Sequence, residues 1–197
     1  MKNIAILFTL LLLWGCNSST EKSTTHDHSE GTEHEHAEKK EAEGKKKPLS
    51  PRTASMVNVG DNHVHIDYGS PSKRDRMIFG GLVGFGQVWA TGAHKATYVN
   101  FGKDVTVGGV EIAAGKYGLF TIPAENEWTI IISKDWDMHL ADDYNEANDI
   151  VRITAVPQQL EEVVESLTFE VNDLGEGKGT VTISWDTTAV SFNITNS

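Results

Sequence analysis

The segment DVTVGGVEIAAGKYGLFTI, Asp104–Ile122, carries the clearest fold signal of the chain. Apolar and polar residues alternate on both sides of Gly108–Gly109, which is the period-two pattern of half-buried β-strands. A pair of glycines between two such runs is typical of a tight hairpin turn. Ala114–Gly115 predicts a second turn, after which residues 117–122 predict another strand. The segment therefore predicts consecutive antiparallel strands joined by short turns.

The same pattern recurs on both sides of this segment. Many short strands separated by turn residues are typical of antiparallel sandwiches and barrels. We therefore predict an all-β fold, an antiparallel β-sandwich of immunoglobulin-like or jelly-roll-like form, with little helix. Short helices are expected over residues 158–165, where Leu160, Val163 and Val164 share one side, and within residues 136–148. The expected strands are residues 63–68, 97–101, 104–107, 110–113, 117–122, 128–132, 150–156, 167–171, 181–185 and 190–194.

Composition divides the 197 residues into three parts. Residues 1–15 have a positive start and an apolar run too short to span a bilayer comfortably, which predicts a signal peptide. Residues 16–50 hold almost no large apolar side chain, so they predict a disordered, His-, Glu- and Lys-rich tether. Residues 51–197 predict one β-sandwich domain, long enough to bury a core of its own.

Leu13-Trp14-Gly15-Cys16 resembles the bacterial lipobox, in which Leu three positions before Cys and a small residue just before it direct lipid attachment. We expect Cys16 to be acylated and to anchor the protein in a membrane of the bacterial cell envelope, on the periplasmic or outer-membrane side. A plain secretory signal with an incidental cysteine is the alternative. Cys16 is the only cysteine, so an internal disulfide is excluded and stability must come from packing.

Residues 51–197 carry 10 Lys and Arg against 20 Asp and Glu, a net charge of −10. Nucleic-acid binding is driven by Lys and Arg that neutralise phosphates, so an acidic domain argues against it. The same charge argues against docking on anionic lipid by charge alone.

Residues 76–101, RMIFGGLVGFGQVWATGAHKATYVNF, interrupt the strand pattern with four glycines in seven positions. The run matches no phosphate-binding loop, and Trp89 stands where a dinucleotide fingerprint needs its last glycine. We expect a tight irregular loop that plugs one end of the sandwich. A Trp beside a cation and an imidazole makes a reasonable wall for a small ligand. The candidate ligand-binding residues are Arg76, Trp89, Thr91 and His94.

Histidines gather in two places that could bind a divalent transition metal. The tether holds four imidazoles within eleven residues, interleaved with carboxylates, which can wrap Zn, Cu or Ni. Two more histidines, His63 and His65, alternate on one face of the expected strand 63–68, where the fold could bring His94 or His139 close as a third ligand. The alternative for each place is solvated polar surface. The candidate metal ligands are His26, His28, His34, His36, His63 and His65.

The acidic stretch 135–146 resembles a calcium-binding EF-hand loop in its spacing, but Leu140 occupies the position that requires Gly. We therefore reject an EF-hand. A looser calcium site using Asp142, Asp143 and Asp149 stands beside the alternative of a solvated acidic loop.

Several motifs of residues 50–194 resemble the bacterial envelope family known as domain of unknown function 2911. The resemblance implies a location and a fold but no activity, because the family has no established one. Ala90 and His94 stand where the family pattern around Trp89 has Arg and Asn. The motifs that carry the resemblance are SPRTAS (50–55), DYGSPSKRDRMIFGGLV (67–83), GQVWATGAHKAT (86–97), AAGKYGLFTIP (113–123), EWTIIISKD (127–135) and TTAVSFNI (187–194).

Three functions remain open from the sequence. The first is a non-enzymatic binding domain for a small molecule, glycan or protein, held on a membrane by its lipid. The second is a metal-binding lipoprotein that works through its His-rich tail. The third is a hydrolase with His94 as base, although no Gly-x-Ser-x-Gly nucleophile elbow is present.

Overall fold

The computed structural model describes residues 48–197, which form one compact unit. The tether histidines and Cys16 lie outside these residues. The described part contains ten β-strands, one short 3-10 helix and no α-helix, and none of its helical segments is long or apolar enough to cross a membrane. The elements are β1 (Arg52–Val59), β2 (Asn62–Gly69), β3 (Tyr98–Phe101), β4 (Val105–Val107), β5 (Val110–Ile112), β6 (Gly115–Ile122), β7 (Trp128–Ser133), η1 (Glu146–Asn148), β8 (Asp149–Ala155), β9 (Gln158–Gly175) and β10 (Lys178–Asn196).

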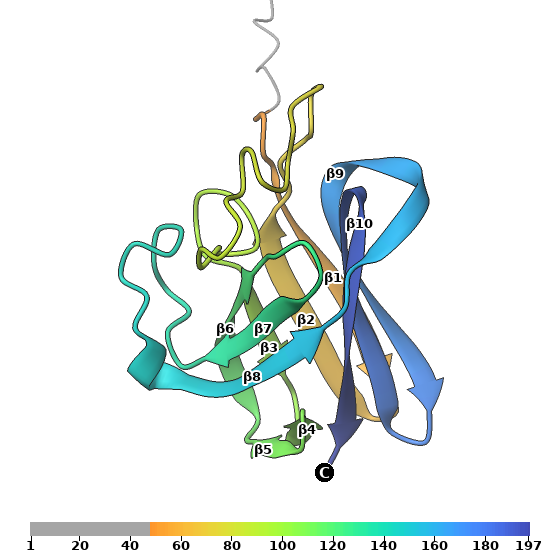
Figure 1. Cartoon of the computed structure of the whole chain (residues 1–197). Coiled ribbons are helices and arrows are strands. Elements are labelled where there is room, and N and C mark those ends of the chain that lie inside the picture. The colour runs from red at the N-terminus through yellow and green to blue at the C-terminus, as the bar shows by residue number, and fades with distance from the viewer. Residues whose placement is uncertain (1–47) are drawn as a thin grey trace, which may run out of the picture. The chain divides into compact units, whose positions relative to one another are not determined.

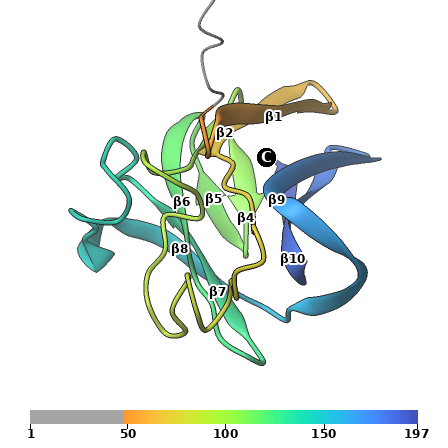
Figure 2. The ribbon, with the colours of Figure 1, turned by 90° about the horizontal axis from the view of Figure 1, so that it is seen from above.

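The strands form two antiparallel sheets that pack as a sandwich (Figure 1). Six strands make one sheet, in the order β1-β2-β3-β6-β7-β8, and four make the other, in the order β5-β4-β10-β9. The hairpin β4–β5 thus leaves the first sheet after β3 and joins the second, before β6 returns to pair with β3. Seen from above, the β9–β10 pair lies across the core from β6 and β8 (Figure 2). The predicted antiparallel β-sandwich is confirmed.

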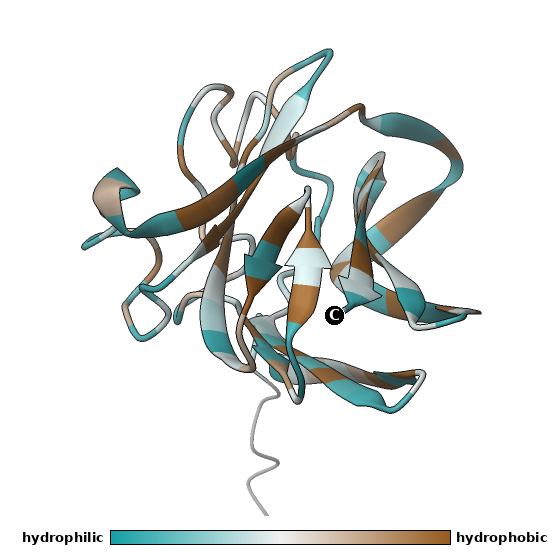
Figure 3. Cartoon of the chain, turned by 90° about the horizontal axis from the view of Figure 1, so that it is seen from below, coloured by the Kyte–Doolittle hydropathy of each residue, from teal (hydrophilic) through white to brown (hydrophobic). Residues whose placement is uncertain are grey.

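Alternating side chains from both sheets fill the space between them. Figure 3 shows hydrophobic and hydrophilic residues following one another along the strands of both sheets. On β2, for example, Val64, Ile66 and Tyr68 are buried and point into the core, whereas the residues between them face outward. A smaller cluster covers the outer face of β6 and β7, where Phe120 and Ile131 pack under the long connections before β3 and after β7. These two connections form much of one end of the sandwich.

The expected helix over residues 158–165 is wrong. These residues begin β9, and Gln159 and Val164 pair with β10 at Thr188 and Asp186. The apolar residues of this run do not form a buried stripe, since Val163 is 54% exposed. Pairing with a long neighbouring strand outweighs helix propensity in a short run whose β-branched residues suit a strand. The strand β1 was also absent from the expected set.

Candidate small-molecule pocket

A pocket of about 470 Å³ opens at the end of the sandwich where the chain enters β1. Figure 1 shows the start of β1 and the connection between β2 and β3 at this end. We call it the Trp89 pocket. Its volume lies within the ~300–1,000 Å³ of typical small-ligand sites. Its walls come from the residues before β1, the connection between β2 and β3, the connection after β7, and β10. The lining residues are Leu49, Ser50, Pro71, Arg74, Arg76, Leu82, Val83, Trp89, Gly92, Ala93, His94, Leu140 and Trp185.

Trp89 is fixed in this wall by its backbone and by its indole. Its backbone pairs with Thr121, in the part of β6 beyond the residues that pair with β3, through two hydrogen bonds of 2.8 and 2.9 Å. Its indole N–H donates to the carbonyl of Gly92 at 3.1 Å. The ring stacks on Trp185, which is 1% exposed and donates its own N–H to the Glu165 carbonyl at 3.2 Å. The aromatic part of the pocket is therefore held rigidly.

The loop that carries His94 leaves the edge of β6 after Trp89 and returns at Thr97, whose carbonyl accepts from the Leu119 N–H at 2.9 Å. Thr97 closes this loop by donating its hydroxyl to the Thr91 carbonyl at 2.9 Å. The loop also lies directly on Gly69, where a Cβ would stand 2.2 Å from the Ala93 oxygen. Gly69 therefore allows the close approach that places the loop at the pocket.

Thr91 and His94 both have positive φ angles, 48° and 66°. This region is unfavourable for residues other than glycine, above all for a β-branched one such as threonine. Thr91 is fully buried, and its hydroxyl bonds to the Thr121 hydroxyl at 3.1 Å and to the Trp89 carbonyl at 3.2 Å. Thr91 therefore holds the strained loop in place and does not line the pocket.

The two arginines of the pocket sit on a turn that is fastened to β9. Ser72 bonds to Ser166 through their hydroxyls at 3.0 Å, and the Lys73 N–H donates to the Glu165 carbonyl at 2.7 Å. The Arg76 guanidinium donates to the carbonyls of Ser72 and Lys73, at 2.6 and 3.0 Å. Arg74 donates to the Leu49 carbonyl at 2.7 Å. Both guanidinium groups are thus positioned by backbone oxygens.

His94 is exposed at the pocket, and its carbonyl accepts from the Leu140 N–H at 2.7 Å, which brings Leu140 to the same wall. Within residues 48–197 no carboxylate or hydroxyl is hydrogen-bonded to the His94 imidazole. A general base of the serine-hydrolase type needs both an orienting group and a nucleophile within reach. Among the described residues, neither partner is hydrogen-bonded to the His94 imidazole.

The structure brings together three of the four residues predicted to bind a ligand. Arg76, Trp89 and His94 line the Trp89 pocket, whereas Thr91 lies behind its wall. Sequence reasoning missed Trp185, which comes from the opposite sheet and carries no local signal. It also missed Arg74, although that residue is only two positions from Arg76 and shares its turn. Ala90, at the position where the family pattern has Arg, is buried in the smaller core cluster and does not line the pocket.

His63 and His65 lie on the outer face of β2, with 6.4 Å between their ring centroids. His63 bonds through Nδ1 to the Asn58 side chain at 3.0 Å, and the neighbouring Asp67 forms an ion pair with Arg52. Among residues 48–197 no three His, Cys, Asp or Glu side chains come close enough to hold a metal ion. His94 and His139 therefore do not add a third ligand to His63 and His65.

The acidic stretch after β7 forms separate ion pairs and hydrogen bonds. Asp142 pairs with His139 at 2.8 Å. Asp149 accepts from the Tyr144 hydroxyl at 2.5 Å and from Arg152 at 2.8 Å, and its other oxygen is buried without a partner among the described residues. Burial, followed by the hydrogen bond to Asp149, raises the pKa of Tyr144 to about 12. Asp149 is thus engaged by Tyr144 and Arg152, and the looser calcium site is not assembled within this part of the chain.

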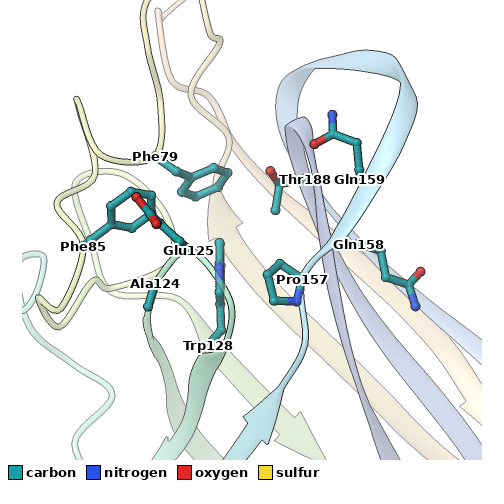
Figure 4. Close-up of a pocket in the computed structure, with 9 residues that line it drawn as sticks. All are labelled: Phe79, Phe85, Ala124, Glu125, Trp128, Pro157, Gln158, Gln159 and Thr188. Atoms are coloured by element: carbon teal, nitrogen blue, oxygen red, sulfur yellow. The ribbon is translucent and has the colours of Figure 1, made fainter.

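A second, smaller hollow of about 170 Å³ lies beside the start of β9 (Figure 4). Phe79, Phe85 and Trp128 line it on one side, and Pro157, Gln159 and Thr188 line it on the other. Phe79 stands 4.8 Å from Trp128 and 6.2 Å from Trp89 between ring centroids, so one aromatic cluster separates the two hollows. At this volume, the smaller hollow lies below the range of typical small-ligand sites.

The fold and the larger pocket define an antiparallel β-sandwich with a ligand-sized, largely apolar pocket at one end. The chain belongs to the DUF2911 family, described as a protein of unknown function, whose model matches residues 50–194. This confirms the family predicted from the sequence motifs. No curated protein and no solved structure matched the chain.

Proposed function

We propose that this protein is a membrane-anchored lipoprotein of the bacterial cell envelope whose β-sandwich domain binds a small, largely apolar molecule in the Trp89 pocket. Lipid on Cys16 holds the protein at the membrane, and residues 17–50 tether the domain. The domain acts by binding, without catalysing a reaction.

One observation carries the binding proposal. Arg76, Trp89 and His94 were chosen from the sequence as a ligand wall, and they line one pocket of ligand size together with apolar side chains from the connections and from β10. Pockets of this kind, apolar with a few polar groups at fixed positions, are the usual form of small-molecule sites. The fixed stack of Trp89 on Trp185 lowers the entropy cost of binding, because the wall is already ordered.

A matched pair of alanine substitutions tests the pocket. Ala93 and Ala124 are both half-buried, and each lines one of the two hollows. We expect the neutral apolar dye Nile red to bind the chain 17–197 with a rise in fluorescence. Ala93→Phe fills the Trp89 pocket and should abolish this rise, whereas Ala124→Phe should leave it unchanged. Equal loss in both variants, or retention in Ala93→Phe, would contradict the proposal.

A second candidate function is metal binding through the tether. The observation that favours it is the interleaving of His26, His28, His34 and His36 with acidic residues. Imidazole and carboxylate together suit Zn, Cu and Ni. The tether lies outside the described residues, so this candidate rests on the sequence alone.

A further inference from the structure

We propose that the Trp89 pocket takes an amphiphile whose head group is anionic, a carboxylate or a phosphate ester, with its apolar body against the two tryptophans. This inference rests on the proposed function, that the pocket binds a small apolar molecule. It adds the charge and the orientation of that molecule.

The charge of the pocket is opposite to that of the domain. Residues 51–197 carry a net charge of −10, yet no Asp or Glu lines the Trp89 pocket. Its charged lining consists of Arg74 and Arg76, and His94 adds an ionisable imidazole. Two cations in the wall of an apolar pocket attract anions and repel cationic ligands there, although the rest of the domain is acidic.

Two acidic side chains bond to this turn, but not to its guanidinium groups. Asp186 pairs with Lys73 at 3.1 Å, and the Glu165 carboxylate accepts from the Arg74 backbone N–H at 3.0 Å. Asp75 is exposed and does not line the pocket. Among the described residues, therefore, no carboxylate forms an ion pair with Arg74 or Arg76.

Both guanidinium groups keep donors for a ligand. Arg has five N–H donors. Arg76 uses two of them for backbone carbonyls, one on Nε and one on Nη2, and Arg74 uses one on Nη2. The planar fork of arginine matches carboxylate and phosphate oxygens, so the same residues suit either head group. Because the carbonyls of Ser72, Lys73 and Leu49 already position these side chains, binding an anion costs little extra ordering.

The rest of the lining suits an apolar body. Leu49, Leu82 and Leu140 line the pocket and are 69%, 51% and 36% exposed. Large apolar side chains that gather around one opening mark a surface that a partner or ligand covers. Together with Trp89 and Trp185 they give the pocket an apolar wall beside its two arginines. This combination is what an amphiphile with one anionic end requires.

A head-group series on one alkyl chain tests the inference with the mature chain 17–197. The probes are decanoate, decyl phosphate, decan-1-ol and decyltrimethylammonium, each below its micelle concentration, titrated calorimetrically and by tryptophan fluorescence. We expect decanoate or decyl phosphate to bind at least roughly tenfold more tightly than the alcohol, as one charge-assisted hydrogen-bond pair would give. The ammonium probe should bind more weakly than the alcohol. The better of the two anions identifies the head group.

The outcomes separate the inference from the proposed function. If the alcohol binds as tightly as both anions, the pocket binds apolar molecules and the anionic inference fails alone. If the ammonium probe binds best, the inference fails as well. If no decyl probe binds, or Ala93→Phe leaves binding intact, the inference and the proposed pocket fail together.

Substitutions then locate the cationic contact. Arg76→Gln should weaken decanoate binding roughly tenfold and change binding of the alcohol much less. Lys178→Gln is the control, because it removes a charge of the same sign at the other end of the sandwich. Lys178 follows Gly177, which contacts Gly60 just before β2 begins, whereas Gly69 at the end of β2 lies next to the pocket. That variant should bind as the wild type does. If Arg76→Gln also abolishes binding of the alcohol, the substitution has disrupted the turn, and Arg74→Gln serves as the second variant. Unchanged decanoate binding in Arg74→Gln would then overturn the proposed arginine contact.

Discussion

The indole of Trp89 stacks on the indole of Trp185 across the two sheets, with 5.9 Å between ring centroids and 23° between ring planes. Trp89 belongs to the irregular segment beside β6, and Trp185 belongs to β10. Trp185 is a core residue and is 1% exposed, whereas Trp89 is only half-buried. The stack therefore ties the pocket wall directly to the core, and the two side chains should respond differently to truncation.

We expect Trp185→Ala to lower the free energy of unfolding by about 3–5 kcal/mol, as truncation of a fully buried aromatic residue does. Trp89→Ala should cost less, because its ring is only partly removed from water in the folded protein, but it should abolish binding of Nile red. Urea denaturation measures both costs, and dye binding at low urea measures the pocket. Equal destabilisation by the two variants would contradict this division between core and pocket.

Thr91 combines a left-handed backbone with a buried, hydrogen-bonded hydroxyl. Thr91→Val keeps the β-branch and removes the hydroxyl, so it should lower the free energy of unfolding by about 1–3 kcal/mol, the cost of unmade buried hydrogen bonds. Thr91→Gly loses the same bonds but also relieves about 1–2 kcal/mol of backbone strain, so it should cost less than the valine variant. Thermal or urea unfolding of the two variants ranks them. A glycine variant less stable than the valine variant would show that the relief of strain is smaller than the cost of glycine's greater freedom in the unfolded chain.

The sequence allowed more of the fold to be predicted than of the site, for physical reasons visible in particular residues. Periodicity in β2 to β8 is local, so strands such as Trp128–Ser133 were recognisable from their own residues. Residues 158–165 were not, because their strand conformation comes from pairing with β10 and not from their own pattern. Arg76, Trp89 and His94 could be grouped because they are neighbours in sequence. Trp185 could not, because only the packing of the second sheet brings it to Trp89.

Tyr144 should make the stability of the fold depend on pH, and this effect can be measured without any ligand in the pocket. Its pKa is raised from the ordinary 10 to about 12, first by burial and then by its hydrogen bond to Asp149. The folded protein therefore holds this proton more tightly than the unfolded chain does. The resulting stability is fully present below pH 10 and is lost as the pH rises from 10 toward 12.

Titration of phenolate absorbance at 295 nm tests this assignment among the four tyrosines. We expect a titration near pH 12 in the wild type that is missing in Tyr144→Phe. Tyr117→Phe is the matched control, because the Tyr117 hydroxyl donates only to the exposed Ala113 carbonyl at 2.9 Å. A titration near pH 12 that persists in Tyr144→Phe would place the shifted pKa on another tyrosine.

Cys16 should carry the lipid that anchors the protein. Expression of the whole chain in a bacterium fed radiolabelled palmitate should give a labelled protein in the membrane fraction, and Cys16→Ser should be unlabelled and released from the membrane. Acyl chains of this length anchor stably only when several are attached to one protein, as a lipidated N-terminal cysteine provides. Labelling retained in Cys16→Ser would rule out lipidation at this residue, and an unlabelled wild type would support a plain secretory signal.

The His-rich tether is expected to bind transition metals if the second candidate function is correct. Calorimetric titration of Zn, Cu and Ni into the chains 17–197 and 48–197 compares the protein with and without the tether. The shorter chain keeps Leu49 and Ser50, so its Trp89 pocket is complete. Tight binding only to the longer chain, lost when His26, His28, His34 and His36 are all changed to Ala, would support metal handling by the tether. Tight binding to both chains would point to the domain, where His63→Ala with His65→Ala is the next variant. Binding to neither would remove the metal function and leave the Trp89 pocket as the site to pursue.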